Sequence, residues 1–459
     1  MLYHPHFTLL LGLALLLSCI HATTLPSNPK HNVLHIISDD LRPDLGAYGV
    51  PNRSTPNIDS LASSGTVFTR AYAQQAVCGP SRNSFMSGRR PDLSRSWNFI
   101  NHFRQDHPTD WTSLPGLFVK DNDFVALGAG KVYHPKLPPC YDGNLSWSPT
   151  ALPYKNPCWN TADDPTAHFQ DGGLPCFFCK IDIESKVFPR RFNTTVANEF
   201  CTTDAYEDTL SIWNAIAQLQ QVPREKYFYL AVGLHKPHLP WQASKEDFAK
   251  HPLSKVKVAK HQFPPVDVPP VALQFTEKPI HASPYAPIYN ASAQLARRAY
   301  RATITGMDRK LKILLDALVA SGRYNNTAIL FHSDHGWHLG ERGLWRKFTN
   351  FEVATQVPLI ISVPWLQQEQ TARNNHPVEL VDVMPTILEL SGVAGLDNKE
   401  AQENPLSGVS LVPLLMNATY SKIKNYALSQ YPRRVTHPDE EWKDNSILHH
   451  NRSEFTHMG

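Results

Sequence analysis

Four groups of charged and imidazole side chains each come directly after a short apolar segment of this 459-residue chain. The carboxyl ends of parallel strands meet at one edge of an open α/β sheet, and ligands bind at that edge. Each group alone is typical of a turn, a helix cap or a solvated surface, but four at one sheet edge favour a single functional site. The residues are Asp39 and Asp40, Lys131 and His134, His235 and Lys236, and Asp334 and His335.

The residue types of this predicted site suit a metal ion beside an anion. Three carboxylates and an imidazole are ligands for a hard divalent cation such as Ca²⁺ or Mg²⁺. The lysines and the remaining histidines suit a tetrahedral anion such as sulfate or phosphate. Side chains alternate along a strand, so Asp39 and Asp40 can face one ligand only where the chain turns, just past the strand end.

Cys78 stands apart from the other cysteines and is the candidate nucleophile. A helix is predicted to begin at Pro80, because Pro is favoured at the first helical position. Backbone N–H groups and the helix dipole favour negative charge near such an N-terminus, which suits a nucleophile that acts on an anionic group. The alternative is an ordinary buried thiol.

Five further cysteines lie within residues 140–201, a stretch rich in Pro and Asp. In an oxidising compartment this spacing predicts a loop excursion held by disulfides. We expect Cys158 to pair with Cys179, because both flank the excursion, and an odd number leaves at least one cysteine unpaired. A zinc site built on Cys176 and Cys179 is the poorer interpretation, because no second pair follows. The five are Cys140, Cys158, Cys176, Cys179 and Cys201.

The segments that would position these side chains alternate between strands and helices. Apolar residues recur every three or four positions from Tyr300 to Leu318, which predicts a long helix that ends near Gly322. Together with the strands, this helix indicates the α/β class, with a central, mostly parallel sheet flanked by helices. The Pro- and His-rich residues 240–290 are expected to form an ordered loop region over the sheet. Apolar runs predict buried strands at residues 33–38, 124–127, 227–234, 328–331 and 359–363.

Composition excludes several classes of protein. The chain has 44 Lys and Arg against 41 Asp and Glu, a net charge of +3, which is too balanced for an electrostatic nucleic-acid binder. Hydrophobic residues make up 42% and aromatic residues 10%, enough for a sizeable core and against wholesale disorder. No repeat at a fixed period is present, which argues against solenoids and coiled coils.

The N-terminus is typical of a secretory signal peptide, which we assign to residues 1–22. The apolar run at residues 7–20 is shorter than the roughly 20 residues that span a bilayer, and no second run of that length follows, so no membrane span is expected. Seven N-x-[ST] sequons agree with an N-glycosylated protein that is lysosomal or secreted. They begin at Asn52, Asn144, Asn193, Asn290, Asn325, Asn417 and Asn451.

A family signature lies at Cys78-Gly-Pro-Ser-Arg82, followed by Ser87-Gly-Arg89. The pattern C-x-P-x-R resembles the sulfatase motif, in which the cysteine is oxidised to formylglycine in the endoplasmic reticulum. The resemblance covers residues 33–459 apart from the divergent region 140–200, and it is closest to the iduronate 2-sulfatase branch. Four further motifs carry it in order, at residues 37–43, 130–135, 233–238 and 333–337.

The resemblance implies a role for each matching residue. A calcium ion would be bound by Asp39, Asp40, Asp334, His335 and an oxygen of the modified Cys78. Arg82 and His134 would orient and polarise the formylglycine hydrate, and Lys131 would contact both it and the sulfate. His235 and Lys347 would face the sulfate ester and its leaving oxygen, so that either could donate the proton. Trp337 would be either a wall for the sugar or a core residue.

The activity implied by the resemblance is hydrolysis of a sulfate ester, through attack of one hydroxyl of the hydrated aldehyde on sulfur. The iduronate branch implies the 2-sulfate of iduronate residues in heparan sulfate and dermatan sulfate, and residence in the lysosome. The implied partners are the sulfated glycosaminoglycan and, during biosynthesis, the formylglycine-generating enzyme. Alternatives are a sulfatase of other specificity, a phosphohydrolase of the same alkaline-phosphatase-like superfamily, and a truncated, inactive glycan-binding homologue.

The expected organisation is a signal peptide, a sulfatase catalytic domain and the start of a further subdomain. The catalytic domain is assigned to residues 30–415, and an alkaline-phosphatase-like fold is implied for it. Residues 416–459 are expected to begin a C-terminal antiparallel subdomain that is incomplete here, which leaves sugar selection less secure than sulfate-ester hydrolysis.

Overall fold

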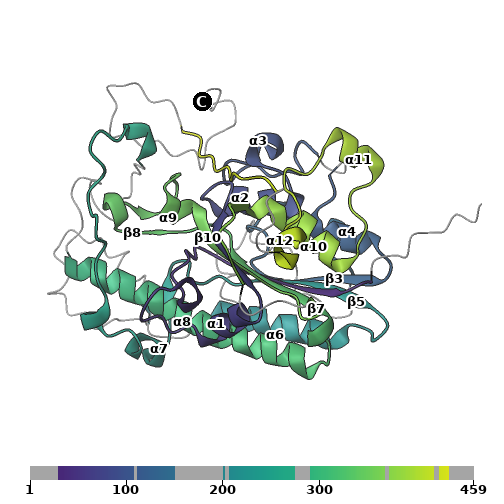
Figure 1. Cartoon of the computed structure of the whole chain (residues 1–459), viewed down its shortest axis with the longest axis horizontal. Coiled ribbons are helices and arrows are strands. Elements are labelled where there is room, and N and C mark those ends of the chain that lie inside the picture. The colour runs from purple at the N-terminus through teal and green to yellow at the C-terminus, as the bar shows by residue number, and fades with distance from the viewer. Residues whose placement is uncertain are drawn as a thin grey trace, which may run out of the picture.

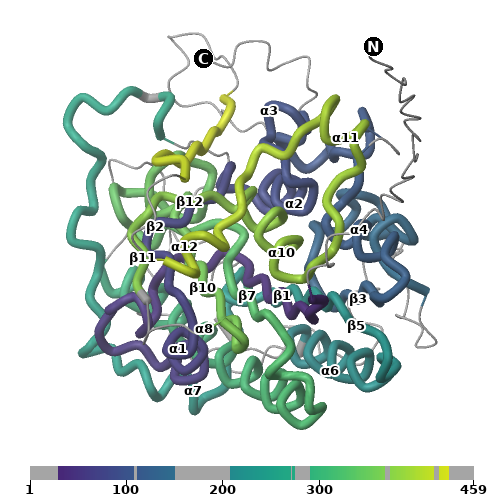
Figure 2. The backbone as a smooth tube through the Cα atoms, turned by 45° about the vertical axis from the view of Figure 1, so that its right-hand side comes forward, coloured from purple at the N-terminus to yellow at the C-terminus, as the bar shows by residue number. Residues whose placement is uncertain are grey.

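The computed structural model describes residues 29–107, 111–149, 200–201, 206–273, 290–366, 372–417 and 423–433. The predicted signal peptide and the predicted Cys158–Cys179 pair lie outside these residues. Cys140 is disulfide-bonded, which agrees with a region held by disulfides, and Cys78 is a free, buried thiol. The last described segment, residues 423–433, packs back against the folded chain (Figure 2). There Lys424 forms ion pairs with Glu379 and Asp382.

One eight-stranded sheet forms the centre of the molecule, with the strand order β11-β2-β10-β7-β1-β5-β3 and with β12 paired to β2 (Figure 1). All five predicted strands belong to this sheet. Its strands are β1 (Asn32–Ser38), β2 (Thr66–Tyr72), β3 (Phe124–Gly130), β5 (Tyr227–Gly233), β7 (Thr327–Ser333), β10 (Gln356–Ser362), β11 (Ala372–Asn374) and β12 (Val378–Glu379). Two-residue strands form two small pairs, β4 (Phe200–Cys201) with β6 (Trp241–Gln242), and β8 (His338–Leu339) with β9 (Trp345–Arg346).

The prediction of a mostly parallel sheet is confirmed. The neighbouring strands β3, β5, β1 and β7 are parallel, so their carboxyl ends share one edge. The exception is β10, which runs antiparallel to both β7 and β2. The register between β1 and β7 places Ser38 opposite Ser333, so the residues that follow these two serines leave the sheet at the same level.

Helices cover both faces of this sheet (Figure 1). Strand β1 shows why, because its side chains alternate between two cores: Val33 and Ile37 belong to one, and Leu34 and Ile36 to the other. The first core is closed by α2 (Cys78–Ser87), α4 (Leu114–Lys120) and α10 (Val383–Ser391), and the second by α1 (Pro56–Ser63), α6 (Tyr206–Gln221) and α8 (Asn290–Ala320). The shorter helices are α3 (Pro91–Ser94), α7 (Lys245–Ala249), α9 (Glu352–Thr355), α11 (Asn398–Glu403) and α12 (Val412–Met416).

Two helix predictions have different outcomes. The long helix is confirmed as α8, with Gly322 in the left-handed conformation just beyond its end. The predicted start at Pro80 is wrong, because α2 begins at Cys78 and Pro80 is its third residue. The first N–H groups of a helix have no partner within it, so Pro is tolerated throughout the first turn. The correction places Cys78 in the first turn rather than before the helix.

The Pro- and His-rich region is described up to residue 273 and is ordered there as a chain of short elements. Helix α7 begins with a capping box between Ser244 and Asp247. It is joined to α8 by the ion pair of Asp247 with Arg309 at 3.0 Å. The chain then continues through a 3-10 helix, Leu253–Lys255.

Two surface properties bear on the secretory prediction. Among the described residues, no helix is both long and apolar enough to cross a membrane. Every sequon asparagine that the structure describes is exposed, which leaves each accessible for glycosylation. These are Asn52, Asn144, Asn290, Asn325 and Asn417.

A chain of three buried polar side chains crosses the first core beneath the carboxyl edge. His35 Nε2 lies 2.7 Å from His332 Nε2, and His35 Nδ1 lies 2.8 Å from the hydroxyl of Tyr229. His332 Nδ1 lies 2.8 Å from the carbonyl of Ser333, so it must donate there. The direction of every bond follows: His35 donates to His332, and Tyr229 donates to His35.

This polar chain predicts a measurable cost for removing its central ring. His35→Leu leaves the Tyr229 hydroxyl and one nitrogen of His332 buried without a partner, so we expect the free energy of unfolding to fall by about 2–4 kcal/mol. Urea denaturation of the purified protein measures this change. The control is His261→Leu at an exposed position, where a change below about 0.5 kcal/mol is expected. Equal effects of the two substitutions would contradict the prediction.

Candidate active site

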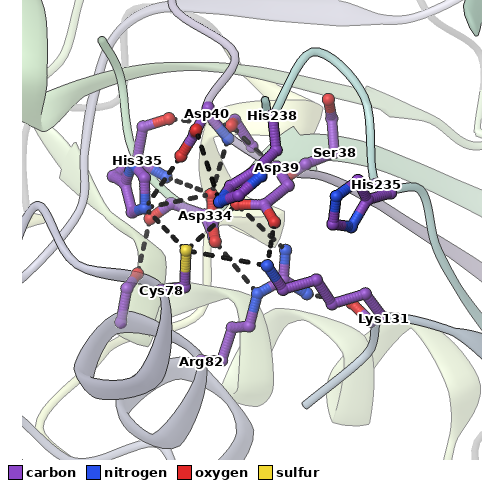
Figure 3. A network of polar contacts seen from close by, with 12 residues as sticks. Ser38, Asp39, Asp40, Cys78, Arg82, Lys131, His235, His238, Asp334 and His335 are labelled. Carbon is purple, nitrogen blue, oxygen red and sulfur yellow. Dashed lines mark hydrogen bonds and ion pairs between the residues drawn. The ribbon is translucent and has the colours of Figure 1, made fainter. Parts of the chain in front are cut away.

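The carboxyl ends of four parallel strands bring the predicted polar residues together (Figure 3). Asp39 and Asp40 follow β1, Lys131 follows β3, His235 follows β5, and Asp334 and His335 follow β7. The first two turns of α2 carry Cys78 and Arg82 to the same point. The predicted convergence of strand ends is therefore present in the fold.

Asp40 shows how two adjacent carboxylates face one point. Its φ is 64°, the left-handed conformation that Asp tolerates better than most residues. Its backbone N–H donates to Asp334 Oδ1 at 3.1 Å, and its carbonyl accepts from the Tyr300 hydroxyl at 2.8 Å. This turn breaks the alternation of the strand, so the side chains of Asp39 and Asp40 both point into the site.

Four side chains surround the sulfur of Cys78, which is 1% exposed. The thiol donates to Asp39 Oδ1 at 3.2 Å, and Lys347 Nζ and His335 Nε2 lie 2.9 Å and 3.4 Å from the sulfur. Lys131 Nζ is 3.8 Å away. Burial, with the charge of Asp39, raises the pKa of this thiol far above its usual range although both lysines oppose the rise. The unmodified cysteine is therefore a neutral thiol and a poor nucleophile.

The carboxylates beside Cys78 form a set of ligands that suits a divalent cation. Ligand atoms of Asp39, Cys78, Asp334 and His335 lie within 4.8 Å of one another, and all four residues are buried. Asp40 Oδ2 is buried and has no hydrogen-bond partner. Burial, together with Asp39 and Asp334, raises the pKa of Asp40 to about 8 although Lys347 opposes the rise. Buried hard oxygen donors, one of which has no hydrogen-bond partner, fit a cation such as Ca²⁺ or Mg²⁺.

Arg82 holds two strand ends together. Its Nε donates to Asp334 Oδ2 at 2.9 Å, and both side chains are 0% exposed. The same guanidinium donates to the carbonyls of Lys131 and Val132 just past β3. Its second terminal nitrogen has no hydrogen-bond partner and lies 3.9 Å from Asp39 Oδ1. Arg82 therefore positions Asp334 and the start of the Lys131 loop, with one donor left toward the site.

Two lysines reach the site, one following β3 and the other following β9. Lys131 forms an ion pair with Asp39, and Lys347 forms one with Asp40 at 2.7 Å. Burial would lower the pKa of Lys347, but Asp40 and its neighbours outweigh it and raise that pKa above its usual range. Both ammonium groups are therefore positive charges beside the sulfur of Cys78.

Trp337 is a core residue in this structure. It is 2% exposed, packs in the second core and lies edge-on to Trp241 at 6.5 Å between ring centroids. Lys347 Nζ lies 5.5 Å from the centre of its ring, within the range of a cation–π contact. This burial favours the core alternative over a wall for the sugar, and the ring contacts Lys347.

Three histidines, His134, His235 and His238, lie around the buried carboxylates. His235 lies beside His238, with ring centroids 4.8 Å apart, and its Nε2 is 3.7 Å from Glu207. Burial and the charge of Lys236 lower the pKa of His235 to about 3. His134 stacks on Phe99 at 4.8 Å, and burial and Lys131 lower its pKa to about 3. The ordinary imidazole pKa cannot be assumed for either residue.

His238 is the site residue that sequence reasoning missed. Its Nε2 lies 3.9 Å from the unpartnered Asp40 Oδ2, and it groups with Asp39 and His235 as a possible ligand set. The signal was present, because His238 closes the motif at residues 233–238. His238 lies five residues beyond the end of β5, so the strand end alone does not predict its position. The intervening turn brings it back to the active site.

Comparison with known proteins identifies what this chain resembles. The model of the Sulfatase family matches residues 31–393. Iduronate 2-sulfatase of Homo sapiens is 36% identical over 403 residues, 80% of this chain and 69% of that protein, and the Mus musculus protein is 34% identical over 400 residues with the same coverage. A phosphonate monoester hydrolase of Agrobacterium radiobacter has a similar fold, with a TM-score of 0.65 at 19% identity, over 90% of this chain and 82% of its own.

The carboxylate cluster predicts divalent-cation binding that depends on Asp334. The protein is first freed of metal with a chelator and then titrated with Ca²⁺ or Mg²⁺. The thermal midpoint of unfolding should rise, because a cation that binds only the folded state stabilises it. Asp334→Asn removes one charge and should weaken binding about tenfold or more, measured by calorimetry. The control is Asp316→Asn, an exposed carboxylate, which should bind as the parent does. Equal affinities of the two variants would contradict the assignment.

Proposed function

Because this chain belongs to the sulfatase family and is a sulfuric ester hydrolase, we propose that it removes the 2-sulfate of iduronate residues in heparan sulfate and dermatan sulfate. The observation that supports the substrate is the identity of 34–36% with two iduronate 2-sulfatases across 80% of the chain. The carboxylate cluster of Asp39, Asp40 and Asp334 and the two lysines around Cys78 would supply a site for the sulfate group.

The proposed metal is Ca²⁺, which Asp39, Asp40, Asp334 and His335 would hold together with an oxygen of the modified Cys78. The set offers carboxylate oxygens and one imidazole, and Ca²⁺ accepts flexible coordination by oxygen. When present, the cation would act as a Lewis acid on the sulfate oxygens and neutralise the buried carboxylates.

Formylglycine at position 78 would supply a hydrated aldehyde as the nucleophile. The environment of the cysteine supports this proposal, because a thiol with a raised pKa, 1% exposed and hydrogen-bonded to Asp39, offers almost no thiolate. Arg82 and Asp39 lie where they can orient the new oxygens, and His134 lies further out beside Phe99.

Lys131 and Lys347 would hold the sulfate group. Their ammonium nitrogens lie 3.8 Å and 2.9 Å from the sulfur of Cys78, close enough to contact an anion bound beside this residue. As point charges with several donors, they stabilise negative charge on sulfate oxygens as the ester bond breaks.

His235 would transfer the proton to the departing sugar oxygen. The substrate-free protein holds His235 neutral, because burial and Lys236 lower its pKa to about 3. An ester sulfate carries negative charge, which would raise that pKa on binding. The proposed acid role therefore depends on the bound substrate, and Lys347 is the alternative donor from the other side.

The substrate assignment predicts a strong preference between sulfate positions. Inorganic sulfate released from a disaccharide with terminal 2-sulfated iduronate should exceed, by about hundredfold in kcat/KM, that released from a matched disaccharide sulfated only at carbon 6 of glucosamine. The preference for the 2-sulfate is expected because only one ester oxygen can lie between the lysines and the carboxylate cluster. Release from the 6-sulfated sugar alone would contradict the substrate while leaving the sulfatase assignment intact.

Conversion of Cys78 predicts a mass change in one tryptic peptide. The peptide at residues 71–82 of secreted protein should be about 18 Da lighter than its thiol form, because CH₂–SH becomes an aldehyde. Protein made in cells without the modifying enzyme is the control, and it should retain the thiol and be inactive. Cys78→Ala should also be inactive with an unchanged thermal midpoint in chelator. An alkylatable thiol at position 78 in fully active protein would contradict the mechanism.

A further inference from the structure

A cavity of 270 Å³ lies outside the active site, between the loop before α1, the chain after α7, and α8. Among its lining residues are Arg53 and Ser54 of the first segment, Lys250 and Lys255 of the second, and Arg301 of α8. It shares no lining residue with the carboxylate cluster or with Cys78. The cavity is therefore a separate feature of the fold, and the sulfatase chemistry does not explain it.

The charge of this cavity is one-sided. Four of its nine described lining residues are Lys or Arg, and none of the nine is acidic. The nearest carboxylate is Asp44, whose Oδ1 accepts from Arg53 Nε at 2.8 Å. In the part of the chain that the structure describes, Lys250 and Lys255 are exposed and have no ion-pair partner. Four cations therefore line the cavity, and Asp44 contacts two of them, Arg53 and Arg301. The cavity is left with an excess of positive charge.

Arg301 provides an independent sign that a ligand is expected. It is 7% exposed, yet its Nε has no hydrogen-bond partner, and its closest described anion is Asp44 Oδ2 at 4.0 Å. A guanidinium has five N–H donors, and buried donors are nearly always hydrogen-bonded. Burial and the neighbouring Arg53 lower the pKa of Arg301 to about 10, as expected where positive charge is not balanced. This buried guanidinium therefore lines the cavity with a donor that has no hydrogen-bond partner.

We propose that this cavity is a second oxyanion site, which binds a sulfate group of the polysaccharide at a point away from the catalytic centre. A planar guanidinium donates two parallel hydrogen bonds to an oxyanion, and the two rim lysines add point charges. The absence of acidic lining residues disfavours a cation or a sugar hydroxyl alone. Free sulfate or phosphate offers the same chemistry, so the experiment distinguishes a free ion from a group on a chain.

The position of the cavity suits a substrate that is held at two points. Tyr300, next to Arg301 on α8, accepts from the N–H of Arg42 at 3.0 Å and donates to the carbonyl of Asp40. The cavity and the active site therefore lie on either side of one short loop, residues 40–44. A chain that binds both sites gains affinity because its second contact is intramolecular. This use of the cavity rests on the proposed glycosaminoglycan substrate, whereas the oxyanion site itself does not.

Charge reversal at the rim tests the proposal without touching the active site. The rim variant carries both Lys250→Glu and Lys255→Glu. The control variant carries both Arg224→Glu and Lys399→Glu, which reverse the charge of two exposed cations elsewhere on the protein. Binding of a fully sulfated heparin octasaccharide and of sodium sulfate is measured by calorimetry, with the N-glycans removed because Asn52 also lines the cavity. The rim variant should bind the octasaccharide about tenfold more weakly than the control.

Each outcome of this comparison decides the proposal. A loss for the octasaccharide alone supports a chain-bound sulfate, and a loss for both ligands supports an oxyanion site that also accepts the free ion. A loss for sodium sulfate alone, or equal affinities of the two variants for both ligands, overturns the proposal. Arg301→Gln should reproduce the octasaccharide loss and Arg301→Lys should restore part of it, with thermal midpoints recorded to confirm folding.

A kinetic measurement separates this proposal from the proposed function. The rim variant should hydrolyse the 2-sulfated disaccharide with unchanged kcat/KM, because the cavity shares no lining residue with the active site. It should show a raised KM for longer chains, whose further sulfate groups the cavity would bind. The parent protein could fail to hydrolyse the disaccharide while the rim variant still binds the octasaccharide more weakly than the parent does. That pair of results would refute the proposed substrate and support the oxyanion site.

Discussion

Three carboxylates buried at one point are the constraint on which the rest of the active site depends. Asp39, Asp40 and Asp334 are each 0% exposed, and an ionised carboxylate removed from water costs several kcal/mol unless it is compensated. Each carboxylate accordingly has its own cation: Lys131 for Asp39, Lys347 for Asp40 and Arg82 for Asp334. The compensation is incomplete at Asp40, whose pKa is raised to about 8 by burial and by the other two carboxylates. Cys78 lies among these charges, and its burial together with the charge of Asp39 raises its pKa and keeps the thiol neutral.

The topology of the sheet keeps these charges together. The register between β1 and β7 makes Asp39 and Asp334 leave the sheet side by side. Because β10 runs antiparallel to β7, it begins at the edge where β7 ends. The connection between them, residues 334–355, therefore never crosses to the other edge of the sheet. It stays over the site and delivers Lys347 there, with Trp337 packed beneath it.

The sequence predicted the features that rest on local pattern, and it failed where a tertiary contact decides. The strands β1, β3, β5, β7 and β10 are continuous apolar runs because both faces are covered, so they were recognised. Strand β2 was missed, because Thr69 and Arg70 interrupt its apolar pattern and its pairing with β10 and β11 stabilises it. The positions of the acidic and basic groups followed from strand ends. The inclusion of His238 and the lowered pKa of His235 depend on packing between distant segments, which no local pattern contains.

The loop at residues 40–44 connects the negative and the positive regions of the molecule. One end carries Asp40, which faces the metal cluster, and the other carries Asp44, which faces Arg53 and Arg301. The loop is fixed to α8 by the two hydrogen bonds of Tyr300. Its Arg42 also forms an ion pair at 2.8 Å with Glu341, which lies in the 3-10 helix Glu341–Gly343. A rigid separation between two binding points lowers the entropy lost when a long ligand binds both. The same short segment thus carries one carboxylate of the active site and one carboxylate beside the proposed oxyanion cavity.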